Sequence, residues 1–316
     1  MMEINLGVAL QTVFTMFIVL CVGYIGRVTK IIDDPLQKGL SNLIIKIGQP
    51  FMIVSAVIKI EYSEENLRIA GIILAIGLGV HTVSALIAYF AALPLKKVPD
   101  ERKISEFAIL FANCGFMGIP VLRSLFGDIG AFWAAVYVVA FNIIQWTYGM
   151  ILLGRDRDDI RPNLLKIFLN FGTTPCIVGI LLFVTRLPIP GPVSEAMNYL
   201  GSLCTPISML IVGAILAKIP VKKLCTSVKI FYYCAVKLVF LPLAVLFLCK
   251  AVGLRAEYAM FATVVAALPT ASNTVMFGES YDISPEYAAH SVAMSTFLSA
   301  ATIPCVLLLA KLVLGL

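Results

Sequence analysis

Two short stretches decide how this chain folds: Asn113–Pro120, which reads NCGFMGIP, and Pro269–Thr274, which reads PTASNT. Both lie inside long apolar segments, yet they gather amides, hydroxyls, glycines and prolines. Proline removes a backbone donor and clashes with the preceding turn, and glycine weakens a helix further. A lipid-facing helix cannot leave backbone groups unpaired, so such stretches are tolerated only in buried protein or beside a wet cavity. We therefore expect two interrupted helices in the interior of a membrane protein.

The composition around these stretches is that of a helical membrane protein. The chain has 316 residues, of which 60% are hydrophobic and 13% charged, whereas a soluble domain carries roughly a quarter charged residues. Apolar runs such as 69–95 and 230–248 approach or exceed the roughly 20 residues that cross a bilayer as a helix. They lack the strict alternation that is typical of membrane strands. These features predict an all-α integral membrane protein.

Charged residues and Pro/Gly punctuation divide the chain into ten expected transmembrane helices. Their ranges are about 5–27, 39–60, 67–92, 104–126, 130–153, 164–186, 194–217, 228–249, 257–278 and 285–313. The first run has no basic leader and is too long for a cleaved signal, so it reads as a span. The connections are short, so no soluble domain is expected.

Lys and Arg predict the orientation. Fifteen of them fall in the odd-numbered connections, seven on the opposite side, and Lys46 and Lys237 within spans. Because cytoplasmic loops are enriched in these residues, we expect a multi-pass protein of the plasma membrane with both termini outside. The net charge of +6 is thereby explained by loops and does not indicate a nucleic-acid partner. The eight cysteines form no CxxC pair, so neither a metal site nor a cofactor is expected.

An internal repeat accompanies the two interruptions. Pro50 in the second expected span corresponds to Pro206 in the seventh, and Ala112 to Pro269, at offsets of 156 and 157. Two halves, residues 1–153 and 164–316, would then hold five spans each. Since five is odd, the second half would enter from the opposite side, giving an inverted repeat of the kind found in secondary transporters. The alternative is chance similarity between apolar helices that share a proline.

The interrupted helices predict a binding site. A helix that restarts at mid-membrane presents free N–H groups and a partial positive charge, which suit a carboxylate. Amide and hydroxyl side chains would add hydrogen bonds. The alternative is a proline kink with small residues for close helix packing. The candidate residues on these two stretches are Asn113, Cys114, Gly115, Pro269, Thr270, Ser272 and Asn273.

Four further polar residues inside expected spans are candidates. Lys46 and Gln49 lie in the second span; the lysine could attract an anion, or its long chain could reach the cytoplasmic interface. Asn142 and Gln145 lie one turn apart on one face of the fifth span. These two could line the site, and hydrogen bonding between helices explains them nearly as well.

The quoted residues resemble a known family. The run NCGFMGIPVL beginning at Asn113 resembles the N-x-x-x-M-G-I-P-L-L signature of the auxin efflux carrier family. That family includes the plant PIN-FORMED carriers and bacterial malate and malonate permeases. Leu268-Pro269 followed by Phe277–Asp282 is similar to its ninth-span pattern.

The resemblance implies a fold like that of the bile-acid sodium symporters. Spans 1, 2, 6 and 7 would form a panel, and spans 3–5 and 8–10 a core in which broken helices 4 and 9 cross over. Asn113 matches the family's crossover asparagine and Pro269 its ninth-span proline. Plant carriers have a proline where this chain has Ala112, which is a departure at the first break.

These inferences predict a secondary transporter for a small organic anion such as a mono- or dicarboxylate, moving by elevator-like alternating access. A sodium-coupled symporter of the bile-acid type and a non-transporting membrane receptor are the alternatives. An enzyme is not expected, because the His81–Ser84 and His290–Ser291 pairs have no acidic partner or nucleophile loop. The sequence leaves open the substrate, coupling to H⁺ or Na⁺, and a homodimer.

Overall fold

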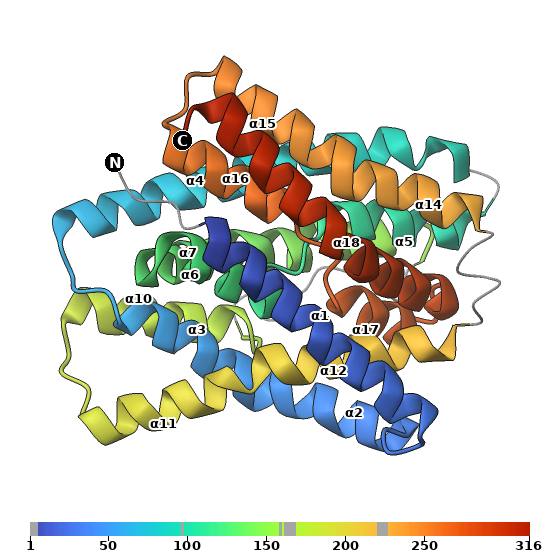
Figure 1. Ribbon diagram of the computed structural model, residues 1–316, viewed down its shortest axis with the longest axis horizontal. Helices are drawn as coiled ribbons and strands as arrows, with labels where there is room; N and C mark the ends of the chain where they lie inside the picture. The colour runs from blue at the N-terminus through green and yellow to red at the C-terminus, as the bar shows by residue number, and fades with distance from the viewer. Residues whose placement is uncertain (1–5, 96–97, 158–159, 161–168, 220–226) are drawn as a thin grey trace.

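The computed structural model describes residues 6–95, 98–157, 160, 169–219 and 227–316, and this part of the chain is helical (Figure 1). The start of the expected sixth span and the cations Lys96, Lys97, Arg161, Lys166, Lys222 and Lys223 lie outside the described residues. The helices are α1 Leu6–Val28, α2 Asp34–Leu43, η1 Ile44–Gly48, α3 Gln49–Ile58, α4 Glu64–Ala91, η2 Leu93–Leu95, α5 Pro99–Leu110, η3 Cys114–Gly118, α6 Ile119–Phe126, α7 Asp128–Ile144, η4 Gln145–Gly149, α8 Met150–Leu153, α10 Thr173–Thr185, α11 Gly191–Ser202, α12 Cys204–Lys218, α14 Val228–Ala235, η5 Val236–Phe240, α15 Leu241–Ala251, α16 Ala256–Ala267, α17 Asn273–Ser280 and α18 Pro285–Leu314.

Seven helical runs of the described chain are long and apolar enough to cross a membrane. They agree within a few residues with seven of the expected spans. The runs are Leu6–Val28, Asp34–Ile58, Glu64–Ala91, Asp128–Leu153, Gly191–Lys218, Val228–Ala251 and Pro285–Leu314. Shorter apolar helices cover Cys114–Phe126, Thr173–Thr185 and Ala256–Ala267. The helices next to the two polar stretches, Cys114–Phe126 and Ala256–Ala267, are thus shorter than the seven long spans.

Side-chain caps fix where the second and third spans begin. The Asp33 carboxylate accepts a hydrogen bond from the Leu36 N–H at 2.8 Å at the start of α2. The Ser63 hydroxyl accepts one from the Asn66 N–H at 3.0 Å at the start of α4. Each cap pairs a donor that the first helical turn leaves free.

Wide π-helical turns precede three prolines inside long helical runs. η1 ends two residues before Pro50, η3 two residues before Pro120, and η5 two residues before Pro242. Proline cannot donate to the preceding turn and its ring needs room there, which a wider turn provides. The runs that contain Pro50 and Pro242 thereby remain continuous, whereas the one at Pro120 begins only at Cys114.

Helices α1 and α12 pack against each other almost backbone to backbone (Figure 1). A Cβ placed on Gly23 would collide with the backbone of Leu210, and one on Gly213 with the backbone of Leu20. Small residues that let helices approach this closely are a common basis of association in membranes. α3 packs beside α10 and α11, so these helices and α1 and α12 form one side of the molecule.

The interrupted helices pack within a second group. α4 contacts α5 and α7, α16 contacts α15 and α18, and α17 contacts α18.

Within this group the buried carboxylate of Glu106 accepts hydrogen bonds from Arg102 at 2.8 Å and from Arg155 at 3.1 Å. Burial acts to lower the pKa of Arg155, but the hydrogen bond and charge of Glu106 outweigh it and raise that pKa.

Candidate functional site

The two polar stretches pair with each other. α5 ends at Leu110 and η3 begins at Cys114, while α16 ends at Ala267 and α17 begins at Asn273. Between these ends, Ala112 and Thr270 form an isolated antiparallel β-bridge. The Asn113 N–H donates to the Pro269 carbonyl at 2.7 Å, and the Ala271 N–H donates to the Phe111 carbonyl at 2.9 Å. Each interruption thus satisfies backbone groups of the other, which is how non-helical chain is tolerated at membrane depth.

Thr270 fixes this junction to its surroundings. It is fully buried, and its hydroxyl donates to the Ala108 carbonyl at 3.1 Å while contacting the Tyr233 hydroxyl. Its N–H donates to the Ser295 hydroxyl at 3.2 Å. The Thr270 side chain is therefore engaged by α5 and α14 and its N–H by α18, and the residue does not line the adjacent pocket.

A small pocket of about 20 Å³ lies where the two interruptions meet. This volume admits about one water molecule. The pocket gathers side chains from α3, η3, α7 and the start of α17. Its lining residues are Gln49, Ala112, Asn113, Cys114, Gly115, Phe116, Val138, Phe141, Ala271, Ser272 and Asn273.

Polar atoms at this pocket have unused hydrogen-bonding capacity. Asn113 Nδ2 and Ser272 Oγ are buried and have no hydrogen-bond partner among the described residues. Asn273 Nδ2 donates to Gln145 Oε1 at 3.4 Å, and Gln145 Nε2 is likewise without a partner there. Buried polar groups are normally paired, so a cluster of unpaired ones marks a place where a polar ligand can bind.

The structure brings together most of the candidate residues and separates two. Asn113, Cys114, Gly115, Ser272, Asn273 and Gln49 line the pocket, and Gln145 reaches it through Asn273. Pro269 contributes its carbonyl to the backbone pairing. Asn142 instead lies against Gly172, where an added Cβ would come within 2.6 Å of its amide. Lys46 is exposed on η1 and is not among the lining residues.

Two neighbours of the junction have no signal in the sequence. Tyr233 contacts Thr270, and the Thr205 hydroxyl of α12 donates to the Phe116 carbonyl at 3.0 Å. A tyrosine and a threonine in apolar helices are too common to single out. Lys237 is different, because a lysine in the middle of a span is unusual; it donates to the Ile109 carbonyl at 3.1 Å.

A larger cavity of about 490 Å³ adjoins the junction. Thr12 of α1, Ser55 of α3, Arg123 of α6 and Thr205 of α12 are among its lining residues. Thr205 lines this cavity, and its hydroxyl donates to the carbonyl of Phe116, which lines the small pocket, so this hydrogen bond links the walls of the two spaces.

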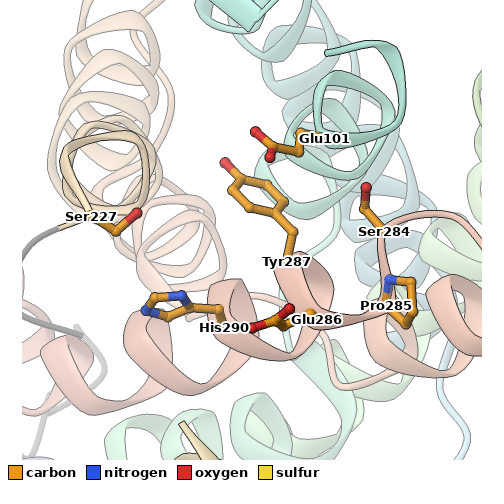
Figure 2. A pocket seen from close by; sticks show the side chains of 7 residues that line it. All are labelled: Glu101, Ser227, Ser284, Pro285, Glu286, Tyr287 and His290. Carbon is orange, nitrogen blue, oxygen red and sulfur yellow. The ribbon is translucent and has the colours of Figure 1, made fainter. Parts of the chain in front are cut away.

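A third cavity of about 530 Å³ is unrelated to the interruptions. Figure 2 shows Tyr287 of α18 extending toward Glu101 of α5, with His290 facing Ser227. Glu101 is paired with Lys229 at 2.6 Å. This third cavity shares no lining residue with the small pocket, so the paired interruptions are the stronger candidate site.

Long apolar helices together with two polar interruptions in the protein interior are features of membrane transporters. Residues 8–307 match the model of the family described as membrane transport protein, and the chain belongs to this family, which includes the auxin efflux carriers. The family resemblance drawn from Asn113–Pro120 is confirmed, and the protein is a transporter and not an enzyme.

Three similar proteins cover nearly the whole chain. One is "Uncharacterized transporter MJ1031" of Methanocaldococcus jannaschii, 25% identical over 303 residues, which are 92% of this chain and 96% of that protein. Another is the "Putative malonate transporter" of Rhizobium meliloti, 24% identical over 300 residues, or 91% and 92% of the two chains. A third is "Uncharacterized transporter YfdV" of Escherichia coli, 18% identical over 308 residues, or 94% and 96%.

Proposed function

We propose that this protein is a secondary transporter for a small organic anion, with malonate and similar mono- and dicarboxylates as the first candidates. The observation that carries this proposal is the cluster of unpaired polar atoms at the paired interruptions, above all Asn113 Nδ2. η3 and α17 both begin at this pocket, so the partial positive charge of two helix starts supplements the side chains. The name of the Rhizobium meliloti relative supports a dicarboxylate.

We further propose that the chain is a pair of inverted five-helix repeats, residues 1–153 and 164–316, whose broken fourth and ninth helices cross at this pocket. The backbone hydrogen bonds from Asn113 to Pro269 and from Ala271 to Phe111 support the crossover. The close α1–α12 pair with α3, α10 and α11 would be the static panel, and the helices around α5 and α16 the moving core. The excess of Lys and Arg in the odd-numbered connections supports an orientation in which both termini lie on the outer side of the cytoplasmic membrane.

In this proposal the 490 Å³ cavity is the way to the site from outside. It lies between helices assigned to the panel and α6 of the core. Arg123 on its wall pairs with Asp128 at 3.1 Å through Nη2, while its Nε has no partner among the described residues and would bind an anion. The pocket admits about one water, so the present arrangement is closed to a dicarboxylate. Breaking the contact between Thr205 and Phe116 would join the two spaces and let substrate reach Asn113.

Uptake of radiolabelled malonate into proteoliposomes tests the assignment. A hydrogen bond to a charged group contributes about 1.5–3 kcal/mol. Asn113→Ala and Asn273→Ala should therefore each raise the malonate concentration at half-saturation by roughly 10- to 100-fold. Asn66→Ala is the matched control, because its amide donates to the Glu61 carbonyl far from the pocket residues in sequence. Unchanged uptake by the Asn113→Ala, Asn273→Ala double variant would show that the anion binds elsewhere.

A further inference from the structure

One buried charged group has no part in the site as described so far. Lys237 lies in the middle of the Val228–Ala251 run and is 1% exposed. Its ammonium donates to the Ile109 carbonyl at 3.1 Å. Among the described residues it forms no ion pair with an aspartate or glutamate. A lysine held inside a membrane protein without a carboxylate needs another source of negative potential.

The end of α5 supplies that potential. The last carbonyls of a helix have no intrahelical partner and carry a partial negative charge. Here the Ala108 carbonyl accepts a hydrogen bond from Thr270, and the next carbonyl, of Ile109, accepts the one from Lys237. The lysine therefore caps the carbonyl end of the interrupted helix, two residues before Phe111 enters the backbone pairing.

This position has a known use in other carriers. Where transporters contain broken helices, the carbonyl ends of the half-helices coordinate the coupling Na⁺, while the N–H ends face the anionic substrate. An anion at the pocket of Asn113 and Ser272 would sit near helix starts that attract it and near the end of α5, which repels it. A cation at the end of α5 offsets that repulsion.

We propose that the ammonium of Lys237 is a built-in cation that takes the place of a coupling Na⁺ at the carbonyl end of α5. The pocket then binds its carboxylate without Na⁺, and Lys237 acts as a positioning residue through the end of α5. This inference rests on the proposed transport of an organic anion and adds the identity of the cation. It also separates this chain from the sodium-coupled alternative.

The corresponding position in the other proposed repeat differs. At an offset of 156, Lys237 corresponds to His81 of α4, which is also fully buried. Its Nδ1 lies 2.7 Å from the Gly77 carbonyl of its own helix, and its ring stacks on Tyr137. Because His81 bonds within α4, the cation at the junction comes from the second half alone.

Malonate binding by the purified full-length protein, measured by calorimetry in NaCl and in choline chloride, tests the proposal. The unaltered protein should bind with the same affinity, within twofold, in both salts. Lys237→Met should bind at least tenfold more weakly in both. Lys250→Met is the matched control: Lys250 lies on the same run and also donates to a carbonyl, that of Val313 at 2.8 Å, but at an exposed site. It should bind like the unaltered protein.

Chemical rescue separates charge from packing. Lys237→Ala should regain at least half of its lost affinity when propylammonium is added, and none when the uncharged 1-propanol is added. Lys237→Arg, which keeps the charge, should stay within a few-fold of the unaltered protein. If Lys237→Met does not fold, these two variants decide the question.

The outcomes are distinct. Full affinity in Lys237→Met or Lys237→Ala, or affinity that rises severalfold with Na⁺ in the unaltered protein, would overturn the built-in cation. If the unaltered protein binds no mono- or dicarboxylate in either salt, the proposed function itself fails, and the inference resting on it falls as well.

Discussion

The replacement Thr270→Val tests the junction between the two interruptions most directly. Valine keeps the shape of threonine, so no cavity forms, but the hydrogen bond to the Ala108 carbonyl and the contact with the Tyr233 hydroxyl are lost. Thr270 is fully buried, and water cannot replace these partners. Hydrogen bonds between membrane helices contribute about 0.6 kcal/mol on average and up to about 1.7, and buried groups left unpaired add to the cost. We expect the free energy of unfolding to fall by about 1–2 kcal/mol.

Thr263→Val is the matched control for this change. Thr263 is equally buried on α16, but its hydroxyl donates to the Ala259 carbonyl of its own helix at 2.7 Å. That carbonyl keeps its helical N–H partner after the change, so the loss should stay below about 0.5 kcal/mol. Reversible unfolding in mixed micelles measures both.

A double-mutant cycle with Tyr233→Phe sharpens the test. Tyr233 and Thr270 share one contact, so each single change removes it, and the double variant should cost less than the sum by about 0.5 kcal/mol or more. Equal stability of Thr270→Val and Thr263→Val, or strict additivity of the Thr270→Val and Tyr233→Phe costs, would contradict a stabilising contact between Thr270 and Tyr233.

Three further changes probe other parts of the molecule. Gly213→Ala should destabilise the α1–α12 contact by roughly 1–3 kcal/mol through overpacking, while Gly79→Ala, which has open space around it, should not; melting temperatures compare them. Glu106→Gln should lower the melting temperature clearly, because it removes the buried carboxylate that pairs with Arg102 and Arg155. Glu257→Gln, which removes the more exposed ion pair with Arg255, should change the melting temperature little. Arg123→Gln should raise the half-saturation for external malonate severalfold and reduce its dependence on salt; equal uptake and salt dependence would exclude this arginine from the entry route.

The sequence predicted the helical membrane class and much of the site because both depend on local chemistry. A run such as Leu6–Val28 lacks the alternation of a membrane strand and is therefore a helix in lipid, because a helix pairs its backbone polar groups within the segment. The stretches Asn113–Pro120 and Pro269–Thr274 likewise stand out because they concentrate polar and helix-breaking residues in apolar surroundings. For the same reason Asn113, Ser272 and Asn273 could be named in advance, and all three line the pocket.

Other features could not be predicted, because they depend on rotation and distance between helices. Asn142 and Gln145 share one face of a helix, yet Gln145 reaches Asn273 while Asn142 lies against Gly172. Lys46 and Lys237 are both lysines in apolar runs, and only Lys46 was a candidate site residue from the sequence. The structure leaves Lys46 exposed and buries Lys237 at the end of α5.

By itself, then, the sequence determined that this chain forms apolar helices and that two of them are interrupted, since composition and proline placement act within a few residues. Only the tertiary structure decided that the interruptions pair through Asn113 and Ala271, although 158 residues separate these positions. A backbone hydrogen bond between distant segments carries no side-chain signature, so the family resemblance implied that the two helices cross but not which backbone groups pair. The packing of α5 against α18, and the contacts of Ala108 and Ile109 with Tyr233 and Lys237, bring Thr270 and Lys237 to the end of α5, beside the small pocket.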